Sequence, residues 1–419
     1  MTDVSRKEAS ASGPEEASEG RSAASGSRSA SPSDPSSPSP GPAAAACPGR
    51  RVLLGHGSGG RLYRDLVRDV FVEAFANPLL ERLDDAVALA PRGRIAFTTD
   101  SHVVQPLRFP GGDIGRLAVA GTVNDLATAA ARPLALAAAF VIEEGFAMDE
   151  LEAICASMAA TAREAGVPIV TGDTKVVEHG ACDGVYITTT GVGEIVVDHE
   201  LGAQAVREGD AVVLSGGVGD HAVAVLAARG DFRFSADVRS DCAPLWSLVE
   251  AAIAAVRGPA RVASGPGDLT PPAATAVRSS GETAQVAGRP TDGAQALRFL
   301  RDPTRGGLTT VLAELAEEAK LGIEVEEAAI PVSPAVRSVC DLLGYDPLTL
   351  ANEGKMVFVI APQASDAVVS ALRAHPLGGD AAQVGVVTAA HPGRVALRTV
   401  FGTRRVLDMP VGELLPRIC

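Results

Sequence analysis

The chain ends in a cysteine, Cys419, whose thiol is a nucleophile placed where no helix or strand can follow it. Two nearby prolines, at positions 410 and 416, remove backbone donors and bias the preceding residues toward extended conformations. We therefore expect residues 411–419 to form a mobile arm, which fully extended would reach roughly 30 Å. Such an arm could bring the thiol into a pocket of its own chain or of a partner. The alternative is a frayed terminus that happens to end in cysteine.

Carboxylates recur directly after apolar runs in the first half of the chain. The segments are Leu83-Asp84-Asp85, Phe97-Thr98-Thr99-Asp100, Thr122-Val123-Asn124-Asp125 and Ile169-Val170-Thr171-Gly172-Asp173. Carboxylates gathered at strand ends suit Mg²⁺, which prefers octahedral oxygen ligands and commonly joins protein carboxylates to substrate phosphates. We therefore predict a site for a metal and a phosphorylated ligand. Each aspartate taken alone could instead cap a helix or a turn.

Glycine-rich loops are the second candidate for phosphate binding. The segment Gly55–Gly60 fits GxGxxG, but the acidic residue and the second strand of a dinucleotide-binding unit do not follow it. An amide-rich loop that closes over phosphates fits better. In Arg301–Gly307, Asp302 should cap a helix and Arg305 could contact phosphate. In Ser215–His221, we interpret His221 as a helix-terminus residue rather than a catalyst.

Charge and cysteine usage restrict the possible partners. The formal net charge is −14, and the basic residues form no block, so a nucleic-acid role based on phosphate attraction is disfavoured. The six cysteines lie far apart without a CxxC pair, which indicates neither a zinc site nor a disulfide framework. The sequence has no apolar run long enough to span a membrane. We predict a protein of the reducing cytoplasm.

Composition divides the 419 residues into four parts. Residues 1–50 are rich in Ser, Ala, Pro and Gly and should be a disordered tail. Residues 51–200 and 201–410 have the patterns of two α/β domains, and 258–293 interrupts the second as a disordered insertion. Residues 411–419 form the arm.

Apolar periodicity predicts the elements that position these residues. Helices are expected over 61–76, 148–166, 220–228, 243–256, 307–320, 334–343 and 364–375. Strands are expected over 95–98, 135–142, 168–171, 185–190, 194–197, 211–214, 323–325, 356–360, 383–387 and 394–399. Glu353 falls on a turn before one of these strands, where a carboxylate is usually solvated. It gains interest only if the terminal thiol comes near, where a base would be needed.

Seven motifs in order resemble the HypE family, the carbamoyl dehydratases of [NiFe]-hydrogenase maturation. They are Gly55–Gly60, Phe109–Gly115, Gly121–Leu126, Val170–Val177, Arg301–Gly307, Ala351–Lys355 and the terminal Pro416-Arg417-Ile418-Cys419. The resemblance covers about Val52 to Cys419 apart from the insertion. It implies a two-domain α/β (α+β) architecture like that of aminoimidazole ribonucleotide synthetase (PurM-like). The first domain would bind ATP and Mg²⁺ and form a homodimer through its sheet.

The resemblance also implies a reaction and its residues. A carbamoyltransferase, HypF, would load Cys419 as a thiocarboxamide, and ATP-dependent dehydration would give a thiocyanate. Its cyanide would pass to iron on a HypC–HypD scaffold complex. Glu353 would act as base, with Lys175 as its partner or as a phosphate contact. The expected nucleotide-binding residues are Gly57, Gly59, Gly60, Asn124, Asp125, Asp173 and Arg305. The expected metal ligands are Asp84, Asp85, Asp100, Asp125 and Asp173.

Two other functions stay open at this point. A relative of the same fold could use ATP on another substrate, as a selenophosphate synthetase or a small-metabolite kinase does, and such an enzyme needs no terminal cysteine. A non-catalytic carrier could instead hold a group on its tail while a partner performs the chemistry.

Overall fold

The computed structural model describes residues 50–58, 60–83, 86–230, 237–257, 295–410, 415 and 417–419. The predicted tail 1–50 except its last residue, the insertion 258–293, and three predicted site residues, Gly59, Asp84 and Asp85, lie outside this set. The described residues belong to one compact unit, Gly49–Cys419. Within them, no helix is long and apolar enough to cross a membrane.

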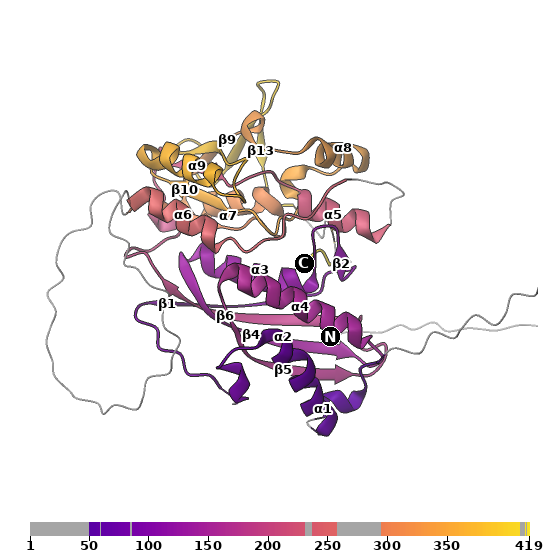
Figure 1. Cartoon of the computed structure of the whole chain (residues 1–419). Coiled ribbons are helices and arrows are strands. Elements are labelled where there is room, and N and C mark those ends of the chain that lie inside the picture. The colour runs from indigo at the N-terminus through magenta and orange to yellow at the C-terminus, as the bar shows by residue number, and fades with distance from the viewer. Residues whose placement is uncertain are drawn as a thin grey trace, which may run out of the picture. The chain divides into compact units, whose positions relative to one another are not determined.

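The first domain is built on a four-stranded sheet in the order β1-β6-β4-β5 (Figure 1). The strands are β1 (Ile95–His102), β4 (Ala131–Glu143), β5 (Ile169–Val177) and β6 (Val185–Ile195). Neighbouring strands are antiparallel except β4 and β5, which are parallel. The helices are α1 (Arg61–Leu66), α3 (Ile114–Thr128) and α4 (Met148–Ala165), with α1 continued by η2 (Val67–Val72) and α2 (Glu73–Phe75).

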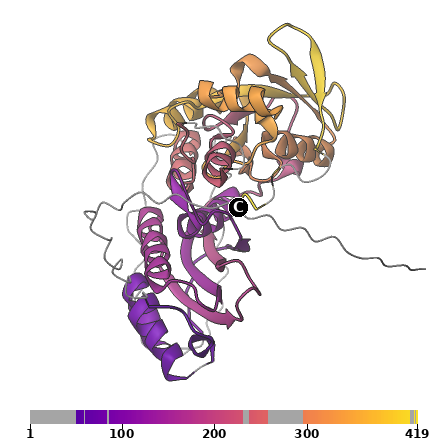
Figure 2. The ribbon, with the colours of Figure 1, turned by 90° about the vertical axis from the view of Figure 1, so that its right-hand side faces the viewer.

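These helices pack on one face of the sheet. Phe71 of η2 stacks on Phe140 of β4 with ring centroids 4.7 Å apart, and Gly191 of β6 lies against Thr122 of α3. Figure 2 shows these indigo and magenta helices along one side of the strands. Residues of the opposite face, such as Phe97 of β1 with 70% of its surface exposed, have no helix of the described part of the chain over them. We call this second surface the open sheet face.

The second domain contains a seven-stranded sheet in the order β13-β12-β9-β11-β7-β10-β8. Its strands are β7 (Ala211–Leu214), β8 (Leu297–Arg301), β9 (Gly322–Glu326), β10 (Val357–Ile360), β11 (Ala382–Thr388), β12 (Val395–Arg398) and β13 (Arg404–Leu407). Its helices are α5 (Asp220–Arg229), α6 (Trp246–Arg257), α7 (Gly307–Ala319), α8 (Pro334–Leu343) and α9 (Ser365–Ala374).

Both faces of this second sheet are buried. Alternate residues of β7 belong to two different core clusters, Val213 to the one that includes α5 and α6 and Val212 to the one that includes α7. This explains why β7 and β10 are uninterrupted apolar runs in the sequence. Between the domains' helices lies a short hairpin, β2 (Arg108–Phe109) and β3 (Gly112–Asp113).

The predicted elements are largely confirmed, and the differences matter for the site. Asp125 does not follow a strand, because 122–125 lies inside α3, whose N-cap Asp113 accepts a hydrogen bond from the Arg116 amide. Asp100 and Asp173 lie within β1 and β5 rather than after them. The prediction that Asp302 caps a helix is wrong, since α7 begins five residues later, at Gly307, and its N-cap is Gly306.

Further corrections concern shorter elements. β8 and β13 were not expected, and the two strands predicted over 185–197 are the single strand β6. The helix expected over 61–76 is only partly buried, since Leu62 in its first turn is 44% exposed.

Candidate active site

The last three residues are docked against the first domain. The Val103 amide donates to the terminal carboxylate of Cys419 and the Gln105 amide donates to the Arg417 carbonyl, both at 3.2 Å, so the terminus pairs with the chain that follows β1. The Ile418 side chain is 3% exposed. The Arg417 guanidinium donates to the Val103 carbonyl and to Asp183. The terminal thiol thus has a defined position in the structure.

Cys419 lies among charged side chains from both domains. Burial raises the pKa of the Cys419 thiol to about 12, with the charge of Glu353 acting in the same direction and that of Arg305 against it. The docked thiol is therefore neutral at physiological pH. We call Cys419, Glu353, Asp100, Asp125, Asp302 and Arg305 the tail group.

Glu353 was expected to be solvated on its turn, and it is instead 3% exposed. Its main chain is fixed on both sides, because its amide donates to Asp241 and its carbonyl accepts from the Ala243 amide. Oε1 has no hydrogen-bond partner among the described residues. Burial raises the pKa of Glu353 well above its ordinary value, and the charge of Asp302 acts in the same direction. Burial thus favours the protonated carboxyl.

Three aspartates complete the acidic part of the tail group. Burial and the charge of Asp125 raise the pKa of Asp302 to about 7. Burial also raises the pKa of Asp125, although Thr98 donates a hydrogen bond to it at 2.9 Å. Burial opposes ionisation of Asp100, but its bond with His102 holds the pKa of Asp100 below the ordinary value. Asp125 and Asp302 line an open cleft of about 490 Å³.

Asn124, a predicted nucleotide contact, joins the two domains in the structure. Its side-chain amide donates to the carbonyls of Ala243 and Glu353 at 3.1 and 3.2 Å, and its oxygen accepts from the Leu245 amide at 2.8 Å. The side chain is 1% exposed. Asn124 therefore holds Glu353 in place, and its contact with a nucleotide stays a prediction.

Lys175 and Asp173 lie elsewhere, on β5. Their side chains pair at 2.9 Å and are mostly exposed. The hydrogen bond from Lys175 lowers the pKa of Asp173. Gly57 packs against the same strand so closely that a Cβ there would lie 2.5 Å from the Val176 nitrogen, and Gly60 precedes α1 in open space. We call Gly57, Gly60, Asp173 and Lys175 the sheet-edge group.

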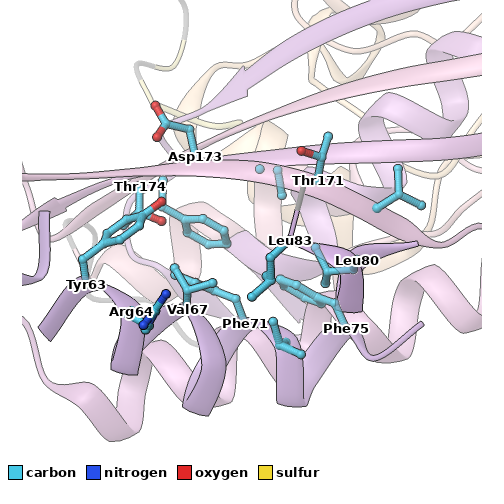
Figure 3. Close-up of a pocket in the computed structure, with 15 residues that line it drawn as sticks. Tyr63, Arg64, Val67, Phe71, Phe75, Leu80, Leu83, Thr171, Asp173 and Thr174 are labelled. Carbon is cyan, nitrogen blue, oxygen red and sulfur yellow. The ribbon is translucent and has the colours of Figure 1, made fainter. Parts of the chain in front are cut away.

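A cleft of about 480 Å³ lies beside the sheet-edge group, between the first helix and β5 (Figure 3). Aromatic rings line its floor, among them Phe71 and Phe75, while Asp173 and Thr174 come from the strand. The cleft offers apolar surface for a flat ring, whereas the Asp173 side chain points away from it.

The strand register separates the two groups within one chain. Asp100 shares a cross-strand row with Thr189, Ala138 and Gly172, whereas Asp173 belongs to the adjacent row with Ala139, Thr188 and Ser101. Adjacent rows point to opposite faces, so Asp100 faces α3 and Asp173 lies on the open sheet face. β1 and β5 are also opposite edges, about 14 Å apart at the usual strand spacing. The predicted pairing of Glu353 with Lys175 is not seen within one chain.

A complete metal site is not present among the described residues. In them, no three His, Cys, Asp or Glu side chains are placed to hold an ion together. Two of the predicted ligands, Asp84 and Asp85, lie outside the described part. Asp100 and Asp125 have the right chemistry for Mg²⁺ and lie near each other, but alone they do not form the site.

Sequence reasoning missed three residues that the structure brings to the site. His221 contacts the tail directly, Asp302 joins the tail group instead of capping a helix, and His102 bonds Asp100. The Gly219-Asp220-His221 turn was a visible signal for the first. Asp302 and His102 gave none, since they meet their surroundings through α3, with Asp125 near Asp302 and Gly121 near His102.

Comparisons with known proteins agree with this architecture. Residues 83–195 match the family model of the AIR synthase related protein, N-terminal domain, and residues 276–398 match that of the C-terminal domain. The chain is 46% identical to the carbamoyl dehydratase HypE of Rhodobacter capsulatus, over 88% of this chain and 98% of that protein.

Two solved structures extend the similarity to three dimensions. A hydrogenase maturation protein HypE in complex with ATP superposes with a TM-score of 0.76 at 43% identity, covering 88% of this chain and 99% of that one. A HypE–HypF complex contains a chain with a TM-score of 0.65 at 39% identity, covering 82% of this chain and 99% of that one.

Proposed function

The chain belongs to the HypE family, and we propose that it dehydrates a carbamoyl group carried on Cys419, using ATP. The observation that supports this most directly is the docked thiol beside the buried carboxyl of Glu353. A thiol held next to an acid–base group suits chemistry on its own substituent. The name of the R. capsulatus relative and the ATP complex of the similar structure support the same reaction.

The reaction is balanced as follows. The amide oxygen of the thiocarboxamide attacks the γ-phosphorus of ATP, and the bond from that phosphorus to ADP breaks. The nitrogen then loses two protons and the C–O bond breaks, which leaves a thiocyanate, ADP and phosphate. Phosphorylation is required because oxide is a poor leaving group and phosphate is a good one. In phosphoryl transfer the protein contributes mainly positioning and charge neutralisation.

Glu353 is the proposed acceptor of a nitrogen proton. Burial raises the pKa of Glu353 well above its ordinary value, which opposes the ionised form that accepts a proton. Positive charge brought near it would favour ionisation. We propose Lys175 as that cation, which the chain itself holds on the far side of the sheet.

A second copy of the chain would bring together Lys175 and Glu353, which are separated within one chain. We propose a homodimer formed through the open sheet face, which carries small and hydroxyl side chains together with the exposed Phe97. Pairing two such faces would bring the sheet-edge group of one copy toward β1 and the tail group of the other. Each site would then be composite.

Mg²⁺ is proposed as the ion that accompanies ATP, where it would neutralise phosphate charge. The described residues supply only part of a ligand set, so no step above depends on it. The remaining candidates are Asp84, Asp85 and Asp173 of either copy.

We propose HypF as the carbamoyltransferase that loads Cys419, because a related HypE chain is found in a complex with HypF. A HypC–HypD scaffold is proposed as the acceptor of the cyanide, and the cytoplasm as the compartment. The division into domains 51–200 and 201–410 and a tail of 411–419 is kept as a proposal. All strands of the first sheet precede residue 200 and all strands of the second follow it.

Mass spectrometry of the C-terminal peptide tests the function. After incubation with carbamoyltransferase, carbamoyl phosphate and ATP, the peptide should gain the mass of a carbamoyl group and then lose one water. Cys419→Ser should prevent both changes and the substrate-dependent ATP turnover. A loaded peptide that never dehydrates in saturating Mg·ATP would refute the proposal. Full ATP turnover by Cys419→Ser would instead favour a small-metabolite kinase.

A further inference from the structure

We infer that His221 is a positioning residue that latches the terminal tail in its docked place, through a hydrogen-bond relay ending on the main chain of Ile418. The inference rests on the proposed function of Cys419 as the carrier of the reacting group. His221 acts on the position of the thiol and not on the reacting atoms.

The relay has a single consistent arrangement of hydrogens. His221 Nε2 lies 2.8 Å from the Ile418 carbonyl oxygen, which can only accept, so Nε2 must donate. Nδ1 lies 2.8 Å from Ser240 Oγ, and the Cys242 amide donates to that same Oγ at 3.0 Å. In the neutral imidazole, Nδ1 then accepts the Ser240 hydroxyl proton. Ser240 thereby fixes the tautomer that can hold the tail.

The surroundings of His221 keep it in this form. The side chain is fully buried, and burial lowers the pKa of His221 below its ordinary value, which favours the neutral imidazole. Phe109 contacts the ring edge to face at 5.4 Å and limits its rotation. Nothing else in the proposed reaction uses this histidine.

Residues at both ends of α5 hold the tail through hydrogen bonds. His221 is its second residue and Arg229 is its last, so the two are separated by about 12 Å along one helix. Arg229 donates to the Gln105 carbonyl at 2.7 Å and to the Arg417 carbonyl at 2.6 Å. The tail is held by hydrogen bonds to residues 103–105 on one side and to α5 on the other.

The same helix is attached to the loop that holds Glu353. The Gly219 amide, which precedes α5, donates to Asn352 Oδ1 at 2.7 Å, and the Ala222 amide donates to the Ala351 carbonyl. The latch therefore places Cys419 relative to Glu353 through a short path of hydrogen bonds. Loading requires the tail to leave and dehydration requires it to return, so the latch sets the balance between these two states.

The test measures how often the tail leaves its site. Full-length protein is treated with iodoacetamide at pH 8, and alkylation of each cysteine is followed by peptide mass spectrometry. The docked thiol is only partly exposed and burial raises its pKa to about 12, so it should react much more slowly than the thiol of the released tail. His221→Asn, whose amide is too short to reach Ile418, should speed alkylation of Cys419 about five-fold, as expected for the loss of one neutral hydrogen bond.

Three controls make the result specific. His221→Gln, which restores a donor near the Nε2 position, should return the rate to within about two-fold of wild type. His199→Asn removes a matching bond, from His199 Nε2 to the Leu297 carbonyl at 2.8 Å, and should leave Cys419 unchanged. Cys340, buried in α8 of the second domain, serves as the internal reference and should react equally in all variants, whereas Cys182 adjoins Asp183, the partner of Arg417 in the tail.

An unchanged Cys419 rate in His221→Asn would overturn the latch, as would an equal rise at Cys340, which indicates general loosening. If His221→Asn does not fold, Ser240→Ala is the alternative variant, because it removes the hydroxyl that fixes the tautomer of His221. An unchanged rate of Cys419 alkylation in Ser240→Ala would also overturn the latch. Alkylation needs neither ATP nor a partner. A wild-type chain that never dehydrates its carbamoyl group would therefore refute the proposed function without touching this result.

Discussion

The tail group and the sheet-edge group differ in almost every physical respect. The tail group is gathered from both domains, and its Glu353 is buried with a carboxyl that prefers to be neutral. The sheet-edge group lies on one exposed strand, where Lys175 and Asp173 satisfy each other. The tail group sets one cation, Arg305, among four carboxyls, and the sheet-edge group presents Lys175 to solvent. The comparison teaches that a single chain holds the two halves of its proposed site in separate environments.

The largest effect is expected from a substitution of Glu353 in the tail group. Glu353→Gln keeps the shape but removes the proton acceptor, so dehydration of preloaded protein should slow by about 10²–10⁴-fold. Loading by the carbamoyltransferase should be unaffected, which single-turnover mass spectrometry can show. Dehydration at the wild-type rate would mean that a partner performs the chemistry and the chain is a carrier.

The open sheet face is tested next. Phe97→Asp places a charge where the proposed dimer buries an apolar ring, and the dimer dissociation constant should rise at least about tenfold. Sedimentation equilibrium measures it. Phe401→Asp is the matched control, since Phe401 is 90% exposed on the loop between β12 and β13 in the second domain. A wild-type chain that is monomeric at every concentration would contradict the proposed homodimer.

Mixed dimers test whether the tail group of one copy works with the sheet-edge group of the other. Glu353→Gln and Lys175→Ala should each be inactive alone. Co-expressed in equal amounts, they should recover about a quarter of wild-type dehydration, because half of the dimers are mixed and one of their two sites is intact. Recovery indistinguishable from zero would show that both residues act within one chain.

The smallest effect is on how the free energy of unfolding depends on pH, which should differ between the two groups. Burial raises the pKa of Asp302 to about 7, so the folded chain binds more protons than the unfolded one between about pH 4 and 7. This carboxyl therefore makes the free energy of unfolding fall as pH rises through that window. Asp302→Asn should remove the fall and stabilise the protein at pH 8 by up to a few kcal/mol, as measured by urea denaturation.

Asp173→Asn is the control for this titration. Its hydrogen bond with Lys175 lowers the pKa of Asp173, so its contribution is present above its unfolded pKa and is lost only in more acidic solution. Between pH 5 and 8, the slope of stability with pH should match that of wild type. A changed slope in this variant, or an unchanged one in Asp302→Asn, would show that the buried and exposed carboxyls do not differ as the structure implies.

The local secondary structure and the reactive residue types follow from the sequence alone. β7 is an unbroken apolar run and α8 has a serine cap, a proline at its first position and a glycine after its end, so both were predicted with their observed bounds. The terminal Cys419 and the motif set also needed no coordinates. These signals are short-range, and a few neighbouring residues contain all of the information.

Which of these residues come into contact depends on the tertiary structure. Asp100 and Asp173 are alike in sequence context, yet register and strand order place them on opposite faces and edges of one sheet. Glu353 looks like a solvated turn residue until Asn124, from the other domain, and the docked tail cover it. Strand register, burial and the perturbed acidity that follows from burial are set by residues hundreds of positions away, and no local pattern contains them.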